Sequence, residues 1–315
     1  MKPDKKKIIN FIGKILIIIS LVFISIQLYK YKINLSIFSD IKFIFLFILL
    51  ALFQGILTFL PPFNYNVILR TICQKKISFS KVTYTYLKSN LYKYLPGNVM
   101  HYVGRNQLAV DEEIPHSEVI FSTVSEILLI LFSGSAVTLI LAYKYLFKWF
   151  EKNNISVFFY LIIFILIIVL FILIFIFRNK IKGKLNKYKE ILIKKGIKTA
   201  LFSILFYSVH FLLSGTLFSV LFILVCGQVE LSVFISIAGL SVMAWIVGFI
   251  TPGVPGGIGV REAVMTMFLS GTSSQDKIIT AVVLYRIICV IGDLAAYLFA
   301  VAFKKISENF KLRER

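Results

Sequence analysis

Long apolar runs are the feature that most constrains this chain. A run of about 18 or more apolar residues is long enough to cross a hydrocarbon core roughly 30 Å thick. Seven such segments occur, near residues 8 to 29, 43 to 60, 117 to 142, 155 to 177, 199 to 226, 231 to 250 and 278 to 303. Hydrophobic residues make up 58% of the 315 residues, so the expected solvent is a lipid bilayer. We therefore predict one all-α, polytopic membrane domain over residues 1–315.

The basic residues predict how this domain is oriented. Lys and Arg number 35 against 15 Asp and Glu, and the basic residues lie in short clusters between the apolar runs. The loop at about 178–198 holds nine Lys or Arg and one Glu, so we expect it in the cytoplasm, together with residues 2–7 and 70–81. The same clusters suit an anionic lipid surface better than nucleic acid.

Two shorter stretches, about 82 to 100 and 262 to 271, are too short or too polar for ordinary spans. Both adjoin Pro-Gly clusters, which predicts re-entrant or broken helices. Seven full spans would leave the basic tail, residues 304–315, outside the cell. We therefore prefer an eighth, partial crossing within 251–275. The basic start, residues 1–7, precedes an apolar run without a small-residue cleavage site, which indicates a retained first span.

A Pro-Gly motif followed by arginine occurs twice. Pro96 and Gly97 precede Arg105, and Pro252 and Gly253 precede Arg261, with seven residues between glycine and arginine in each copy. The copies are 156 positions apart. Duplicated halves with broken helices are typical of transporters whose substrate site lies between the halves. The spacing predicts such an internal repeat, and coincidence is the alternative.

The second copy carries the stronger signal for a binding site. Residues 251–262 contain two prolines and four glycines, so this backbone cannot remain helical. Within lipid, its amide groups must be buried in protein or line a wet cavity, where they could bind a phosphate. The candidate residues here are Pro255, Gly256, Gly257, Gly259, Arg261 and Glu262. The alternative is a tight hairpin in which Arg261 pairs with Glu262 or with a carbonyl group.

Ionisable residues within apolar segments are costly and usually face the interior of the bundle. We expect the arginines to bind a phosphodiester while the acidic residues balance their charge in the empty state. The alternative is a set of static ion pairs that fix the helix register. His101 is a candidate proton carrier or a hydrogen-bonding interface residue. The candidates from these segments are Arg105, Glu126, His210, Arg286 and Asp293.

Signals for metals and cofactors are weak throughout the sequence. The three cysteines lie far apart and lack the spacing of a metal site, and the glycines at 253–259 follow no strand that could hold a dinucleotide. No ATP-binding motif occurs. We therefore predict neither a metal nor a cofactor.

Both Pro-Gly elements resemble those of a known family. Tyr94-Leu-Pro-Gly-Asn-Val with Gly104-Arg105, and Pro252-Gly-Val-Pro-Gly-Gly-Ile-Gly-Val-Arg-Glu262, are similar to the flippase-like transmembrane domain of lysylphosphatidylglycerol synthases. In the two-part synthases, the resemblance implies, this domain translocates lipid and a separate soluble domain transfers the aminoacyl group. Stand-alone relatives are associated with export of other lipids, including hopanoids and polyprenyl-linked sugars. We expect a stand-alone member, because no segment here is long and polar enough for that soluble domain.

Three functions follow as hypotheses. The first is a lipid translocator of the bacterial or archaeal cytoplasmic membrane, whose partner is an anionic phospholipid or a polyprenyl-linked lipid held between the two Pro-Gly elements. The second is a membrane-embedded lipid or polyprenyl-phosphate transferase with an acidic general base. The third is a non-catalytic scaffold that docks lipid- or glycan-biosynthesis enzymes through its basic loop. The scattered carboxylates favour transport over transfer.

Overall fold

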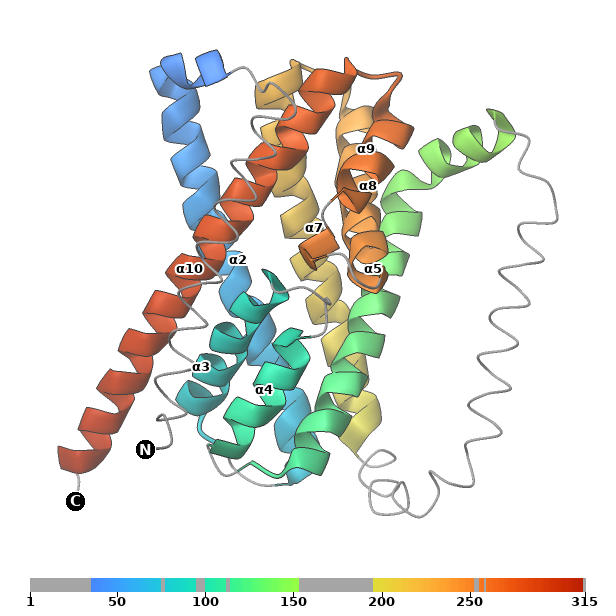
Figure 1. Ribbon diagram of the computed structural model, residues 1–315. Helices are drawn as coiled ribbons and strands as arrows, with labels where there is room; N and C mark the ends of the chain where they lie inside the picture. Colours follow the sequence, from blue (N-terminus) through green and yellow to red (C-terminus); the bar gives the residue numbers. More distant parts are fainter. Residues whose placement is uncertain are drawn as a thin grey trace.

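The computed structural model describes residues 35–74, 77–94, 100–111, 114–152, 195–251, 255–257 and 259–313 (Figure 1). Every regular element in these residues is a helix, which confirms the all-α prediction. In chain order they are η1 (Leu35–Ser39), α2 (Ile41–Cys73), α3 (Phe79–Asn90), η2 (Leu91–Tyr94), α4 (Met100–Asp111), α5 (His116–Lys152), α7 (Ile197–Cys226), α8 (Leu231–Ile250), η4 (Pro255–Gly257), α9 (Val260–Leu269) and α10 (Gln275–Arg313).

Five helices of the described part are long and apolar enough to cross a membrane, namely α2, α5, α7, α8 and α10. They correspond to five of the seven predicted segments. The other two, 8–29 and 155–177, lie outside the described residues, as does most of the basic loop. The chain is therefore a multi-pass membrane protein.

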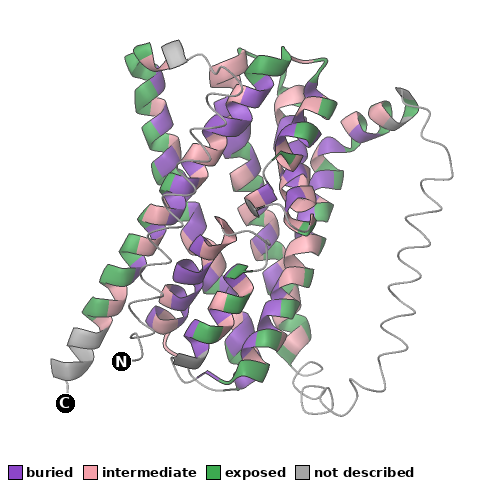
Figure 2. Cartoon of the chain, in the orientation of Figure 1, coloured by how far each residue is buried: buried purple, intermediate pink, exposed green. Residues whose placement is uncertain are grey.

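The outward faces of these helices are apolar. Large hydrophobic side chains such as Phe45 and Leu52 on α2, Leu128 on α5 and Leu298 on α10 are more than half exposed. Figure 2 shows the buried residues gathered between the helices and the exposed ones along their outer sides. Such surfaces are costly in water and suit lipid tails.

Helix α2 is longer than the apolar segment that predicted it. The segment ends at residue 60, before Pro61 and Pro62, and a proline inside a helix normally bends or ends it. The structure continues the helix to Cys73. The added turns carry polar residues, some of which form hydrogen bonds with other helices of the bundle. Asn64, for example, is fully buried and accepts a hydrogen bond from the hydroxyl of Ser203 on α7.

Two hairpins enter the bundle from opposite ends (Figure 1). Hairpin 1 consists of α3 and α4 with η2 between them, and hairpin 2 consists of α8 and α9 with η4 between them. Their tips, η2 and η4, contact each other near the middle of the bundle. The two stretches predicted to be re-entrant or broken, about 82–100 and 262–271, fall within these hairpins. Hairpin 1 continues beyond its predicted stretch through α4, and α8 of hairpin 2 is the span predicted at 231–250.

Each hairpin is flanked by two long helices, so the chain contains two similar halves of opposite orientation. The first half is α2 to α5, and the second is α7 to α10. In this comparison α2, α3, α4 and α5 correspond to α7, α8, α9 and α10. Helices α2 and α3 both pack on α10, and their counterparts α7 and α8 both pack on α5. Helix α4 packs on α5, and its counterpart α9 packs on α10. Exchanging the halves therefore preserves these neighbours, as expected of an inverted repeat.

Contacts between distant segments place the basic regions at one end of the bundle. The hydroxyls of Thr71 on α2 and Thr199 on α7 are 3.0 Å apart. Ser80 on α3 and Ser307 on α10 are hydrogen-bonded at 3.2 Å. The short helix α9 returns the chain toward the opposite end before α10 crosses back (Figure 1). The described part of the basic tail thus lies on the same side as residues 70–81, as the partial crossing predicts.

Candidate functional site

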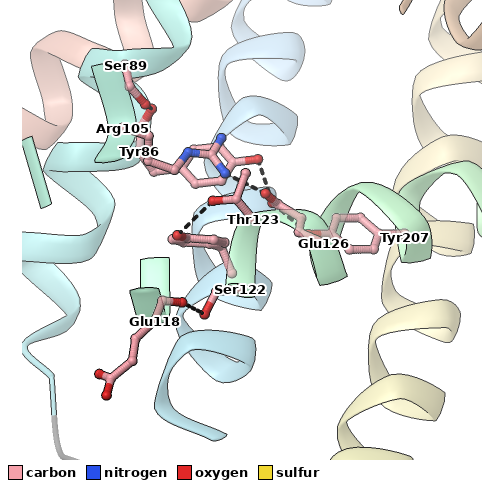
Figure 3. A network of polar contacts seen from close by, with 9 residues as sticks. Tyr86, Ser89, Arg105, Glu118, Ser122, Thr123, Glu126 and Tyr207 are labelled. Carbon is pink, nitrogen blue, oxygen red and sulfur yellow. Dashed lines mark hydrogen bonds and ion pairs between the residues drawn. The ribbon is translucent and has the colours of Figure 1, made fainter. Parts of the chain in front are cut away.

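Glu126 on α5 ties three other helices together (Figure 3). Its carboxylate forms an ion pair with Arg105 of α4 and accepts hydrogen bonds from the hydroxyls of Tyr86 on α3 and Tyr207 on α7, each at 2.9 Å. Arg105 is 2% exposed and Glu126 is 1% exposed. We call these four residues the Glu126 cluster. Such a buried pair needs these additional hydrogen bonds to offset its desolvation.

Aromatic rings complete the surroundings of Arg105. The centre of its guanidinium is 3.7 Å from the ring centroid of Tyr86, 4.7 Å from that of Tyr65 and 5.4 Å from that of Tyr102. Cation–π contacts of this kind favour a buried charge. With its charge paired and its faces covered, Arg105 holds hairpin 1 in place against α5.

Asp293 on α10 fixes the tip of hairpin 1. Its carboxylate pairs with Lys93 at 2.6 Å and accepts hydrogen bonds from the Tyr94 hydroxyl at 2.6 Å and from the Asn90 amide at 3.2 Å. Asp293 is 3% exposed, whereas Lys93 is 29% exposed. Three residues within a five-residue stretch of hairpin 1, Asn90, Lys93 and Tyr94, therefore bind one buried carboxylate.

Glu262 fixes the tip of hairpin 2 in a comparable way. It forms an ion pair with Arg286 of α10, and it accepts a hydrogen bond from the backbone N–H of Gly259 at 2.7 Å. Arg286 also donates to the carbonyl oxygen of Gly257 at 2.8 Å. Gly257 and Gly259 have φ angles of 70° and 82°, a conformation that glycine adopts without strain. This segment is therefore a fixed turn that begins helix α9.

Arg261 lies at the same turn without a counter-charge. Its side chain runs along the backbone of the hairpin, since a Cβ added at Gly248 or Gly257 would come within 3.2 Å of its Nε. No hydrogen bond or ion pair joins it to any of the described residues, and its Nε is buried without a partner. The alternative in which Arg261 pairs with Glu262 does not hold, because Arg286 occupies that carboxylate.

We call the region formed by η2, η4, Gly259 to Glu262 and the segment of α10 from Arg286 to Asp293 the tip junction. It brings together eight of the predicted residues: Pro255, Gly256, Gly257, Gly259, Arg261, Glu262, Arg286 and Asp293. Pro255 begins η4 and Gly256 follows it with a φ of 58°. Pro96 and Gly97 lie outside the described residues, and η2 ends two residues before Pro96.

The remaining candidates lie elsewhere. Arg105 and Glu126 belong to the Glu126 cluster. His101 is 6% exposed on α4, and its Nδ1 has no hydrogen-bond partner among the described residues. The ring centroid of His210 on α7 is 5.8 Å from that of Phe211. Within the described ranges, no hydrogen bond links His210 to the Glu126 cluster or to the tip junction.

Sequence reasoning missed Lys93, Tyr94 and Asn90, the three residues of hairpin 1 that bind Asp293. A signal was present, because Lys93 is a charged residue directly before a Pro-Gly element in a membrane segment. It also missed Tyr86 as a ligand of Glu126. A tyrosine in an amphipathic helix is common, so its sequence position alone carries little information.

Two hairpins that meet inside a bundle of apolar helices, with charged residues at their tips, define a class of polytopic membrane proteins built as inverted repeats. The chain matches the family described as "Lysylphosphatidylglycerol synthase TM region" over residues 11–296. It therefore belongs to that family, as the two Pro-Gly elements predict. No curated protein matches the chain.

Proposed function

We propose that this protein moves a lipid between the two leaflets of a cell membrane, with the head group passing the tip junction while the acyl chains stay in the bilayer. The observation that carries this proposal is the meeting of the two hairpin tips. There, charged and backbone polar groups gather near the middle of a bundle whose outward faces are apolar. Charged groups at such depth are costly, and in membrane proteins they usually mark a substrate route.

The inverted arrangement of the halves supports transport. Transporters built from inverted repeats place their substrate at the repeat interface, and irregular backbone at membrane depth usually lines it. Here η4 is irregular backbone of that kind, and η2 of the other half contacts it. The membrane we propose is the bacterial or archaeal cytoplasmic membrane, and the partner is a membrane lipid.

The charge pairing favours transport over transfer. A transferase needs a general base within reach of its substrate. Its candidates, Glu126, Glu262 and Asp293, are each 3% exposed or less, and each carboxylate is already bound to a cationic side chain. Arg261, in contrast, is partly exposed, and no described residue forms a hydrogen bond or an ion pair with its side chain. This combination suits binding of a head group without chemical change.

The test is leaflet exchange in liposomes. Purified protein is reconstituted with a phospholipid labelled on an acyl chain, and the label in the outer leaflet is reduced with dithionite over time. Protein-free vesicles and vesicles that carry an unrelated polytopic protein are the controls. We expect the protected inner-leaflet fraction to decline only with this protein, and the extracted lipid to be unmodified. A modified lipid would favour the transferase, and exchange at the control rate would contradict the proposal.

A further inference from the structure

The charges at the tip junction do not balance. The described residues there include three cationic side chains, those of Lys93, Arg261 and Arg286, against two carboxylates, those of Glu262 and Asp293. The neighbouring residues that the structure does not describe, 95–99, 252–254 and 258, contain no ionisable side chain. The tip junction therefore carries one excess positive charge from its side chains.

Each carboxylate of the tip junction already forms an ion pair with a cationic side chain. Glu262 binds Arg286 and the N–H of Gly259. Asp293 accepts from three groups of hairpin 1, Lys93 among them. A cationic head group arriving here would have to break one of these ion pairs before it found a counter-charge. Breaking a buried pair leaves an uncompensated charge, which is strongly unfavourable.

The excess charge resides on Arg261. Its side chain lies against Gly257 of η4, and η4 contacts η2 of hairpin 1. It therefore faces the contact between the two halves from hairpin 2. A guanidinium presents several N–H donors in a plane that matches two oxygens of a phosphate, which is why arginine is frequent in phosphate sites.

We propose that the tip junction selects head groups of net negative charge, such as a phosphodiester without an attached amine, through Arg261, and discriminates against cationic head groups. This inference rests on the proposed translocation and adds the chemical class of the substrate. The inference also gives the two repeated arginines different roles. Arg105 is structural, because Glu126 neutralises its charge, whereas Arg261 binds the head group.

The experiment compares three acyl-labelled tracers in the same proteoliposomes: phosphatidylglycerol, which is anionic, phosphatidylcholine, which is zwitterionic, and a diacyl trimethylammonium lipid, which is cationic. Wild type is compared with Arg261→Gln, which removes the charge, and Arg261→Lys, which retains it. Lys305→Gln is the matched control, because it removes one positive charge at an exposed position near the end of α10. Release of entrapped radioactive phosphate is measured in parallel. Thermal melting confirms that each variant is folded.

For wild type we expect the anionic tracer to exchange fastest and the cationic tracer slowest. Arg261→Gln should slow the anionic tracer roughly 10- to 100-fold, the range for loss of one charge-assisted hydrogen bond. Arg261→Lys should retain the order of the tracers at a lower rate, and Lys305→Gln should match wild type. Because the order in wild type needs no mutation, a folding defect in a variant leaves the inference testable.

The outcomes separate the two proposals. If no tracer exchanges faster than in protein-free vesicles, the proposed function fails, and the inference fails with it. If the tracers exchange at equal rates, if the cationic tracer is fastest, or if Arg261→Gln keeps the anionic preference, translocation stands and the inference alone is wrong. Release of phosphate without lipid exchange would mean that the site takes a free anion, which would also overturn the inference.

Discussion

The guanidinium of Arg286 contacts both carboxylate oxygens of Glu262, with Nε 2.8 Å from Oε1 and Nη2 3.1 Å from Oε2. Glu262 follows Arg261 directly in the sequence, yet a residue on another helix neutralises it. Because this pair is closed, the charge of Arg261 stays available at the contact between the hairpin tips. The availability of one arginine thus depends on the pairing of its neighbour.

Without Arg286, Glu262 should form an ion pair with Arg261 instead. In Arg286→Gln the carboxylate of Glu262 loses its counter-charge, and Arg261 is the nearest cation in sequence. We expect lipid exchange to fall roughly tenfold or more, as we also expect for Arg261→Gln, because Arg261 would then pair with Glu262 and no longer be available to the lipid. The double variant Arg286→Gln with Glu262→Gln removes both members of the pair and should recover exchange. A double variant as slow as the single one would contradict this account.

Glu126→Gln should destabilise the protein by about 3–5 kcal/mol, the cost of leaving a buried charge such as that of Arg105 uncompensated. Thermal unfolding in detergent, followed by intrinsic fluorescence, measures the change. Glu230→Gln is the control, since Glu230 is exposed at the start of α8. Replacing both Arg105 and Glu126 with leucine should be less damaging than Glu126→Gln. Equal melting temperatures for Glu126→Gln and the Glu230 control would show that the ion pair is unimportant.

Gly292→Ala should loosen the crossing of α2 and α10. A Cβ at this position would lie 2.8 Å from Cγ of Gln54 and 3.0 Å from the backbone nitrogen of Gly55. Forcing these helices apart should cost about 1–3 kcal/mol, as overpacking does elsewhere. Gly271→Ala is the matched control, because its Cβ would meet no atom within 4 Å. The prediction is wrong if the two variants melt at the same temperature.

The opposed halves predict a specific cross-link. After the three native cysteines are replaced with alanine, Ser80→Cys with Ser307→Cys should form a disulfide on mild oxidation, because the two hydroxyls are 3.2 Å apart. A shift in gel mobility that is reversed by reductant reports the bond. Ser80→Cys with Thr272→Cys should remain unlinked, since Thr272 lies between α9 and α10 at the other end of the bundle. Linkage of the second pair alone would contradict the topology.

Much of the fold could be predicted from the sequence because the bilayer simplifies the problem. Any backbone that crosses lipid must satisfy its own hydrogen bonds, so a long apolar run is a helix with few exceptions. Pro-Gly clusters mark the places where that rule is relaxed, and hairpins 1 and 2 lie at those places. The extension of α2 beyond Pro61 was missed, because it depends on polar contacts with other helices, such as the bond from Ser203 to Asn64.

The candidate site was harder to predict, because pairing between distant residues has no local signal. Arg105 and Arg261 occupy the same position in the repeated motif, but Arg105 is buried against Glu126, whereas Arg261 has no ion-pair partner in the part of the chain that the structure describes. Glu126 is 21 residues from Arg105 in the sequence, and Glu262 is 24 residues from Arg286. Only the packing of α4 on α5 and of α9 on α10 determines these pairs. Lys93 acquires its role in the same way, through the approach of hairpin 1 to Asp293.

The most direct test of the central claim is the exchange rate of acyl-labelled phosphatidylglycerol in vesicles that contain either wild type or Arg261→Gln at equal protein density. The account predicts exchange well above protein-free vesicles for wild type and a rate roughly 10- to 100-fold lower for the variant, with equal melting temperatures. Wild-type exchange at the protein-free rate would contradict lipid translocation. Equal exchange by the two proteins would contradict a route past Arg261.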